Sequence, residues 1–279
     1  MQSLNLKWRP KCFAEVIGQP AIISILSKQI ETKTFKNTYL FAGPSGCGKT
    51  TLARIMAKEI NNNEGEPIEI DAASNNGVDN IRALISEAQQ MSLDSDYKIF
   101  ILDECHMLTT AAWNAALKLI EEPPINSIFI FCTTNANKIP DTILSRVQRF
   151  DFKKISNSDI ADRLEFILNE EGDYTFEKDA LLKIASKSNV YMREAISLLE
   201  KCTDFSKDVT IDNVSKVLGL IKDLDFYNLV KSLINKDEIN SLNIYNNLKA
   251  YESDVNNLLD IFNALTIVAL CMLTITYFA

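Results

Sequence analysis

Residues 43–50 read Gly-Pro-Ser-Gly-Cys-Gly-Lys-Thr, which is the complete pattern G-x-x-x-x-G-K-[ST]. The β-branched and aromatic run 38–42 precedes it and predicts a buried strand. Apolar residues at helical spacing in 51–60 predict a helix directly after it. In this order, glycines let backbone N–H groups surround a polyphosphate, and the start of the helix adds partial positive charge. The sequence therefore predicts a phosphate-binding loop between a strand and a helix.

Two side chains of this loop have roles beyond those of the backbone. We expect Lys49 to reach the β- and γ-phosphates of a nucleoside triphosphate, and the Thr50 hydroxyl to ligate Mg²⁺. A chance glycine turn would not be expected to carry all four fixed residues of the pattern in this context. The residues predicted to bind the nucleotide here are Gly43, Pro44, Ser45, Gly46, Cys47, Gly48, Lys49, Thr50 and Thr51.

A second nucleotide signature follows further along the chain. The apolar run 97–102 predicts a strand, and it closes on Asp103 and Glu104. Asp103 can hold Mg²⁺, usually through water, and Glu104 can polarise the water that attacks the γ-phosphate. A strand with a merely acidic end is the alternative, and the loop upstream disfavours it. For His106, the only histidine, structural support is favoured over catalysis.

Strands and helices are predicted to alternate through the first half of the chain. Such alternation favours a parallel sheet covered by helices on both faces, with the ligand site at the carboxyl ends of the strands. Polar residues 133–135 end one of these strands, where a side chain can hydrogen-bond the attacking water or the γ-phosphate. The further strands are expected at 68–71, 127–132 and 149–152, and the helices at 20–32, 78–90, 110–120 and 140–146.

Composition narrows the classes of protein that remain. A chain of 279 residues favours two domains or three small ones, and a net charge of −8 argues against coating nucleic acid through bulk positive charge. This net charge does not exclude nucleic-acid binding by a local surface of basic side chains or backbone amides. Six cysteines lack C-x-x-C spacing, which gives no readable zinc site and indicates a reducing cytosol. The N-terminus has no apolar signal stretch, so a cytoplasmic protein is expected.

Two segments allow alternative interpretations. Residues 7–18 read as an extended arm and turn, and Trp8, Arg9 and Pro10 could hold an adenine ring. On the residues alone, packing of this arm against the core is favoured. Residues 75–77 open the helix expected at 78–90, where they could hold a phosphate but are favoured as ordinary caps.

From about residue 156 the strand pattern stops. Helices expected at 156–170, 177–188, 191–203 and 210–218 predict a small helical second domain. Arg193 begins one of these helices and could close over a phosphate, although spacing alone favours a solvated arginine. The helical segment 222–279 ends in the uncharged stretch 261–279, for which burial in a larger assembly is favoured over a membrane span or an abnormal C-terminus.

Taken together, these motifs resemble those of the γ/τ subunit family of the bacterial DNA polymerase III clamp loader, or a phage-encoded relative, within the AAA+ ATPases. The resemblance covers about residues 5–220 in the family's order. The segments that carry it are 7–10 (Lys-Trp-Arg-Pro), 43–50, 69–74 (Glu-Ile-Asp-Ala-Ala-Ser), 103–108 (Asp-Glu-Cys-His-Met-Leu), 117–124 (Leu-Lys-Leu-Ile-Glu-Glu-Pro-Pro), 133–134 (Thr-Thr) and 143–146 (Ile-Leu-Ser-Arg).

The resemblance implies an α/β AAA+ P-loop NTPase domain at 1–155, a helical lid at 156–220 and a partial helical collar at 221–279. It also implies site residues that spacing could not prove. Thr134 matches the first sensor, Arg146 matches the arginine that acts in trans on a neighbour's ATP, and Arg193 matches the second sensor. Trp8, Arg9 and Pro10 match the segment around the adenine, which reverses the interpretation of that arm. ATP and Mg²⁺ are the implied cofactors.

The function implied is an ATPase that opens a sliding clamp and loads it on primed DNA, as a component of a DNA-directed DNA polymerase holoenzyme. The implied partners are the clamp, other clamp-loader subunits and primer-template DNA, and no membrane association is expected. With the other subunits the chain would form a pentamer if its partial collar is sufficient for assembly. Residues 61–67 stand where the family carries a four-cysteine zinc module, so no zinc is expected. The polymerase-binding tail of the longer family form is not expected either. Another AAA+ DNA motor, such as a branch-migration helicase, and a non-catalytic nucleotide-binding scaffold subunit are the alternatives.

Overall fold

The computed structural model describes residues 3–90, 92, 94–219 and 223–249. The chain divides into two compact units, of which the first comprises Met1–Ile167 and Ala185–Ser197. The second comprises Leu168–Ile184 and Leu198–Ala279. This division passes within helices, so the three-domain boundaries expected from the sequence stay a prediction.

The first unit is built on a five-stranded sheet with the order β2-β3-β4-β1-β5, in which every pairing is parallel. This confirms the α/β fold class. All the expected strands form, within one residue of their predicted starts and ends. The strands are β1 (Thr38–Ala42), β2 (Ile68–Asp71), β3 (Lys98–Asp103), β4 (Ser127–Thr133) and β5 (Gln148–Asp151).

The strand order decides which loops meet at the carboxyl edge of the sheet. Strand β4 lies between β1 and β3, because Ala42 pairs with Thr133 and Leu102 pairs with Phe131. The phosphate loop that follows β1 and the acidic pair that ends β3 therefore lie on either side of the tip of β4.

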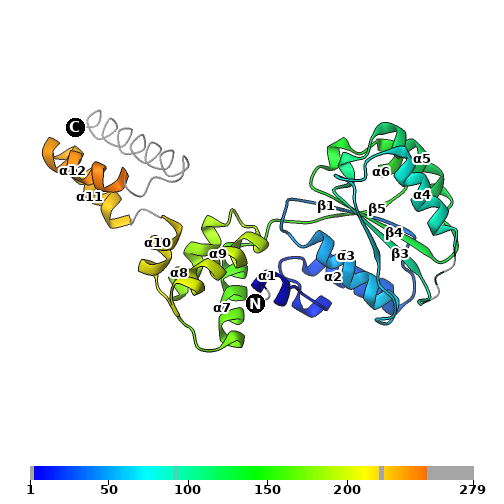
Figure 1. Ribbon diagram of the computed structural model, residues 1–279, viewed down its shortest axis with the longest axis horizontal. Helices are drawn as coiled ribbons and strands as arrows, with labels where there is room; N and C mark the ends of the chain where they lie inside the picture. Colours follow the sequence, from blue (N-terminus) through cyan, green and yellow to red (C-terminus); the bar gives the residue numbers. More distant parts are fainter. Residues whose placement is uncertain (1–2, 91, 93, 220–222, 250–279) are drawn as a thin grey trace, which may run out of the picture. The chain divides into compact units, whose positions relative to one another are not determined.

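Helices cover both faces of this sheet, as Figure 1 shows. Helices α2 (Pro20–Glu31) and α3 (Lys49–Ile60) pack on one face. The other face is covered by α4 (Val78–Ala88), α5 (Thr110–Glu121) and α6 (Asp141–Leu144).

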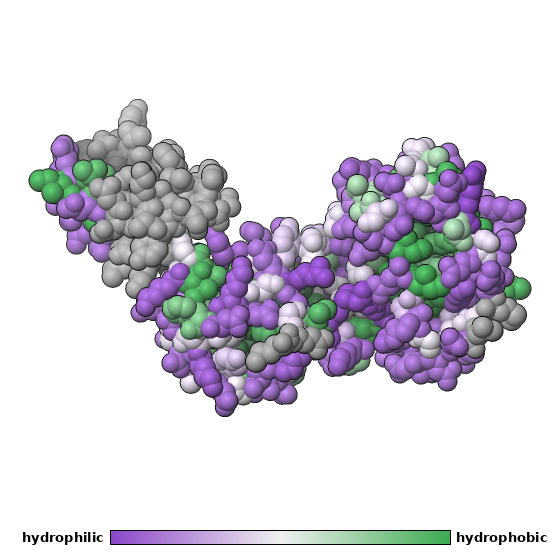
Figure 2. Space-filling view, viewed as in Figure 1, coloured by the Kyte–Doolittle hydropathy of each residue, from purple (hydrophilic) through white to green (hydrophobic). Residues whose placement is uncertain are grey.

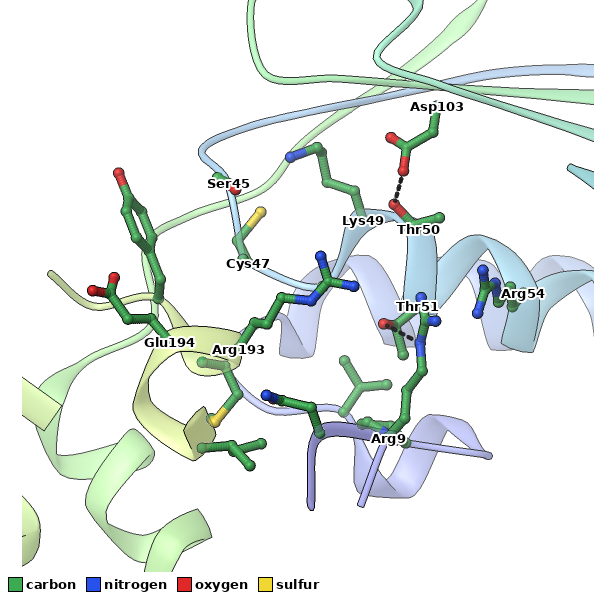
Figure 3. Close-up of a pocket in the computed structure, with 18 of the residues that line it drawn as sticks. Arg9, Ser45, Cys47, Lys49, Thr50, Thr51, Arg54, Asp103, Arg193 and Glu194 are labelled. Carbon is green, nitrogen blue, oxygen red and sulfur yellow. Dashed lines mark hydrogen bonds between the residues drawn. The ribbon is translucent and has the colours of Figure 1, made fainter. Parts of the chain in front are cut away.

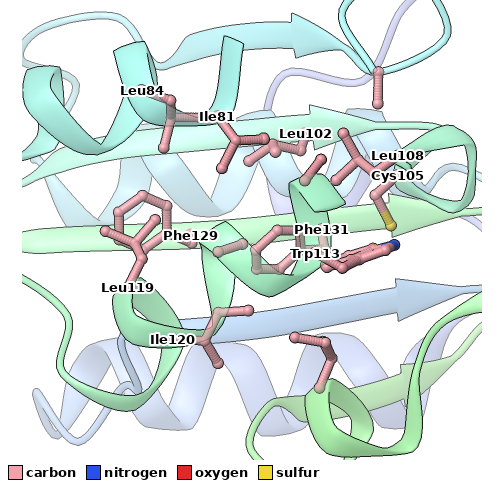
Figure 4. Close-up of a cluster of buried hydrophobic side chains, with 14 of the residues drawn as sticks. Ile81, Leu84, Leu102, Cys105, Leu108, Trp113, Leu119, Ile120, Phe129 and Phe131 are labelled. Atoms are coloured by element: carbon pink, nitrogen blue, oxygen red, sulfur yellow. The ribbon is translucent and has the colours of Figure 1, made fainter. Parts of the chain in front are cut away.

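Alternate residues of each central strand enter opposite cores, which explains why these strands read as continuous apolar runs. In β3, Phe100 faces the cluster under α4 and α5, and Ile101 faces the cluster under α3. The Phe100 ring stacks on Phe129 of β4 with 5.1 Å between centroids. Trp113 of α5 packs against the Phe131 ring in the same cluster, which Figure 4 shows. Two-sided burial holds the strand ends, and hence the site, in fixed positions.

The amino-terminal arm differs from the extended arm expected from the sequence. It contains a short helix, α1 (Leu4–Lys7), and a 3-10 turn, η1 (Phe13–Glu15), before the left-handed Gly18. Lys7 is the last residue of α1, and the Trp8 N–H bonds back to the Leu4 carbonyl at 2.9 Å. Between Pro10 and Gly18 the turn η1 interrupts the extended backbone, whereas α1 overlaps the predicted arm only at Lys7.

Beyond β5 the described residues are mainly helical, as expected. One feature was missed: the two-residue strands β6 (Thr175–Phe176) and β7 (Asp208–Val209) pair in parallel. Two residues are too few to show a period, so no pattern could have predicted them. The helices are α7 (Asn157–Glu171), α8 (Lys178–Lys187), α9 (Met192–Phe205), α10 (Ile211–Leu218), α11 (Asp223–Ile234) and α12 (Glu238–Lys249).

Hydrophilic side chains cover most of the face visible in Figure 2, and apolar ones gather in small areas between them. Among the described residues, no helix combines the length and apolar character needed to cross a bilayer. The uncharged stretch 261–279, for which the sequence favoured burial in an assembly, lies outside the described residues.

Candidate functional site

The phosphate loop occupies the turn from β1 into α3, and its glycines are required by its backbone. Gly48 precedes the first residue of α3 with a φ of 96°, in the left-handed region that side chains rarely adopt. A Cβ on Gly43 would lie 2.7 Å from the Phe152 carbonyl oxygen. These two positions therefore keep the loop tight against the end of β5 and turn it into the helix.

Lys49 is nearly buried within this loop, with 5% of its surface exposed. Its Nζ atom donates to the carbonyl oxygens of Gly43 at 2.9 Å and Pro44 at 2.8 Å. Backbone carbonyls satisfy the ammonium group without neutralising its charge. A phosphate oxygen entering the loop would meet an ammonium group that is already in position.

The Thr50 hydroxyl donates a hydrogen bond of 2.8 Å to Asp103 Oδ2, which joins the start of α3 to the end of β3 (Figure 3). A hydroxyl oxygen next to a carboxylate is the donor set that Mg²⁺ prefers, together with phosphate oxygens and water. These residues fit the metal that the sequence predicted.

Glu104 follows Asp103 with a φ of 47°, an uncommon left-handed conformation for a residue with a side chain. Its Oε2 atom accepts from the Thr134 hydroxyl at 2.9 Å and lies 3.2 Å from His106 Nδ1. Nδ1 is also 3.3 Å from the Thr133 hydroxyl. The strand order thus brings the Glu104 carboxylate to the tip of β4, where His106 supports it.

A cavity of about 760 Å³ opens in front of the phosphate loop (Figure 3). The arm, the loop, the acidic pair and the start of α9 all contribute to its wall. Most of the predicted site residues line it. They are Trp8, Arg9, Pro10, Ser45, Gly46, Cys47, Gly48, Lys49, Thr50, Thr51, Asp103, Glu104 and Arg193.

Cations are concentrated in this cavity. Arg9 donates from Nε to the Thr51 hydroxyl at 3.2 Å, directly beside the loop. Burial lowers the pKa of Arg9, the neighbouring charges of Arg54 and Arg193 lower it further, and the carboxylates of Glu69 and Asp103 oppose this shift. Like charges held this close repel one another. A polyanion such as a triphosphate would relieve that repulsion.

Sequence reasoning missed several residues of this wall. Arg54 lies one helical turn after Thr50 and forms an ion pair with Glu69 of β2, and i,i+4 spacing could have indicated it. Arg163 of α7 is 8% exposed and donates to the Trp8 carbonyl at 3.1 Å. Nothing in the sequence near Arg163 indicated this contact, because it joins residues 155 positions apart.

Four predicted residues lie outside the cavity wall. The carbonyls of Gly43 and Pro44 face Lys49, as described above. Thr134 reaches the site only through Glu104. Among the described residues, Arg146 is not part of the cavity wall, and its Nε lies 2.8 Å from Glu121 Oε1. The expectation that Arg146 serves a neighbouring subunit is untested.

The segment that replaces a zinc module is a short loop. Asn61 fixes its start by accepting from the Tyr97 N–H at 3.0 Å and donating to the Tyr97 carbonyl at 2.8 Å. Within the described ranges, no three histidine, cysteine or acidic side chains are grouped to hold a metal ion. Burial raises the pKa of the Cys105 and Cys132 thiols above the usual range, which disfavours the thiolate form that zinc requires.

The sequence-based expectation that the purified full chain carries no stoichiometric zinc stays a prediction. Elemental analysis after dialysis against buffer that contains micromolar zinc should give far less than one zinc per chain. One tightly held zinc per chain, retained through that dialysis, would overturn the prediction.

Three features define the AAA+ fold of P-loop NTPases. They are a phosphate loop after β1, an acidic pair at the end of β3, and the position of β4 between β1 and β3. Solved structures agree: a single-residue variant of Thermotoga maritima RuvB superposes with a TM-score of 0.65 at 23% identity, covering 83% of this chain and 80% of that chain. A second structure, the T. maritima RuvB Holliday junction branch migration motor, gives a TM-score of 0.64 with the same identity and coverage. At this identity the likeness establishes the fold alone.

Sequence relatives narrow the class to one family. The subunit tau of Bacillus subtilis DNA polymerase III is 38% identical, over 93% of this chain and 50% of its own length. The subunit gamma of Buchnera aphidicola subsp. Baizongia pistaciae is 36% identical, over 84% of this chain and 69% of its own. A family model described as DNA polymerase III, delta subunit, matches residues 63–156. The chain belongs to the DNA polymerase III gamma/tau family, and spans about half the length of the B. subtilis relative.

Proposed function

We propose that this chain is an ATPase subunit of a clamp loader, which couples ATP binding and hydrolysis to opening a sliding clamp and loading it on primed DNA. The observation that carries the proposal is the cavity whose wall contains Lys49, the Thr50–Asp103 pair and Glu104. Membership of the gamma/tau family supports the clamp and the DNA as partners.

In this proposal each side chain has one task. Lys49 exchanges its bonds to the loop carbonyls for bonds to the β- and γ-phosphates. Arg9 and Arg193 bind the remaining negative charge, and Trp8 and Pro10 border the base. Glu104 orients the attacking water and accepts its proton, while Thr134 holds that carboxylate.

Thr50 and Asp103 would hold Mg²⁺ in this site. The ion would neutralise charge on the phosphate oxygens when bound. Asp103 also accepts from the Glu104 N–H at 2.9 Å, so it fixes the backbone on which the general base stands. The gamma/tau relatives favour clamp loading over branch migration, because the likeness to RuvB extends only to the fold.

The test is the ATPase rate of the assembled subunits with and without clamp and primed DNA. We expect the two together to stimulate hydrolysis, because they complete the geometry of the site. Lys49→Ala should abolish the activity by weakening ATP binding, whereas a surface variant such as Lys118→Ala should not. Strand displacement that needs no clamp would refute clamp loading, and binding without turnover under every condition would support the scaffold alternative.

A further inference from the structure

Residues 117–124, Leu-Lys-Leu-Ile-Glu-Glu-Pro-Pro, form the end of α5 and the turn after it. The site described above uses none of them. Glu121 is the last residue of α5, where the helix dipole disfavours an acidic side chain and favours a nearby cation. A cation is therefore the favoured neighbour of a carboxylate at this position, and Arg146 supplies one.

The contacts of Arg146 come from two helices. Its Nε lies 2.8 Å from Glu121 Oε1. Its Nη1 donates to the Thr142 carbonyl at 2.7 Å and to the Ser145 hydroxyl at 3.1 Å. Among the residues that the structure describes, Nη2 has no hydrogen-bond partner. The two hydrogen bonds of Nη1 and the ion pair at Nε thus orient the guanidinium, and Nη2 keeps its donors.

A second arginine of the same region shows the contrast. Arg149 uses Nε and Nη2 together, both bonded to Asp151 Oδ1 at 2.9 and 2.7 Å. That arrangement occupies the pair of donors that a phosphate would take. Arg146 is held at Nε and Nη1 instead, which orients the group and leaves Nη2 as the donor for a further anion.

The backbone that carries Arg146 and Glu121 is held in place by helix packing. Helices α5 and α6 lie next to each other on one face of the sheet (Figure 1), and Ile120 and Ile143 are buried in the same core cluster. The Thr38 hydroxyl of β1 donates to the Arg146 carbonyl at 3.3 Å. The side chains of Arg146 and Glu121 are 40% and 47% exposed, so their ion pair contributes little to stability. The effect of this ion pair is to orient the guanidinium group of Arg146.

We infer that Glu121 is a positioning residue for Arg146: it holds the guanidinium so that Nη2 can reach a phosphate bound by an adjacent subunit. The inference rests on the proposed function, because it needs Arg146 to act in trans. It assigns a role to the first of the two acidic residues in the 117–124 segment, Glu121, which acts only through the arginine and touches no nucleotide.

The test replaces Glu121 with Gln in the full chain and measures ATP hydrolysis by the assembled complex with clamp and primed DNA. We expect kcat to fall by roughly ten- to hundred-fold with KM for ATP unchanged, since misplacing a group by about 1 Å can cost that much. ATP binding and the melting temperature should stay at parent values. Glu121→Asp, which keeps the charge on a shorter stem, should recover part of the loss.

The neighbouring Glu122 supplies the matched control. It is exposed, and Glu122→Gln should leave kcat at the parent value. In mixed assemblies, the defect of Glu121→Gln should follow the subunit that supplies the arginine, because a general loss of structure would also impair the subunit's own ATP site. A defect that follows the ATP-binding subunit would overturn the inference.

Two further outcomes separate the inference from the function on which it rests. A normal kcat for Glu121→Gln beside an inactive Arg146→Ala would refute only the positioning role. A normal kcat for Arg146→Ala would refute the trans mechanism itself. A higher kcat for Glu121→Gln would mean that Glu121 restrains the arginine, which also contradicts positioning.

Discussion

The substitution Glu104→Gln is expected to leave ATP binding intact and to lower the rate of hydrolysis by about 10²–10⁴-fold, the usual contribution of a general base. Glutamine has the same shape and can still accept from the Thr134 hydroxyl, so the tip of β4 should keep its arrangement. It cannot take a proton from water. Nucleotide binding and single-turnover hydrolysis, measured on the same preparation, separate these two effects.

Lys49→Ala gives the opposite pattern and serves as the comparison. Its loss should appear in the affinity for ATP, because Lys49 contacts phosphate in the ground state as well as during transfer. If Glu104→Gln hydrolyses ATP at the parent rate, Glu104 is not the base. Another carboxylate that lines the cavity, such as Glu69, would then have to be tested.

Replacing Arg146 with Ala should leave the affinity of a single subunit for ATP nearly unchanged and remove the hydrolysis that clamp and DNA stimulate, by roughly 10³-fold or more. Arg146 is not part of the wall of its own cavity among the described residues, which gives the reason for the unchanged affinity. A guanidinium supplied from an adjacent subunit stabilises charge on the transferring phosphoryl group. ATP binding by the isolated variant and hydrolysis by the assembled variant test both parts.

Mixing subunits decides whether the arginine acts in trans. Arg146→Ala chains should be partly rescued by Lys49→Ala chains, because the first keep an ATP site and the second supply the arginine. Arg149→Ala, an exposed arginine paired with Asp151, is the matched control and should retain full activity. Absence of rescue at every mixing ratio, in a preparation shown to co-assemble, would mean that Arg146 acts within its own chain or is structural.

Local sequence pattern was sufficient to predict the strands and helices of the sheet domain. Residues 38–42 and 68–71 form strands with the bounds expected, and Thr109 caps α5 by accepting from the Ala112 N–H at 3.2 Å. Each of these depends on neighbours a few positions away, which is the range over which period and capping signals act. The two-residue strands β6 and β7 were missed because they are held only by their pairing with each other.

The site residues also divide into those that local sequence predicts and those that only the fold brings together. The phosphate loop and the acidic pair are each contiguous, so their residue types and spacing already indicated phosphate and metal chemistry. The residues that surround them come from distant segments: Arg163 meets the carbonyl of Trp8, and Arg54 meets Glu69. The i,i+4 spacing from Thr50 could have indicated Arg54, whereas nothing in the sequence near Arg163 indicated its contact.

The sequence by itself determined the class of this protein, because the phosphate loop needs its glycines, lysine and threonine in one continuous turn. Only the tertiary structure decided how the parts meet. The position of β4 between β1 and β3 brings Thr134 to Glu104, and the packing of α5 on α6 brings Glu121 to Arg146. Strand order and helix packing are set by the burial of both faces of the sheet, a property of the whole chain that no short segment contains.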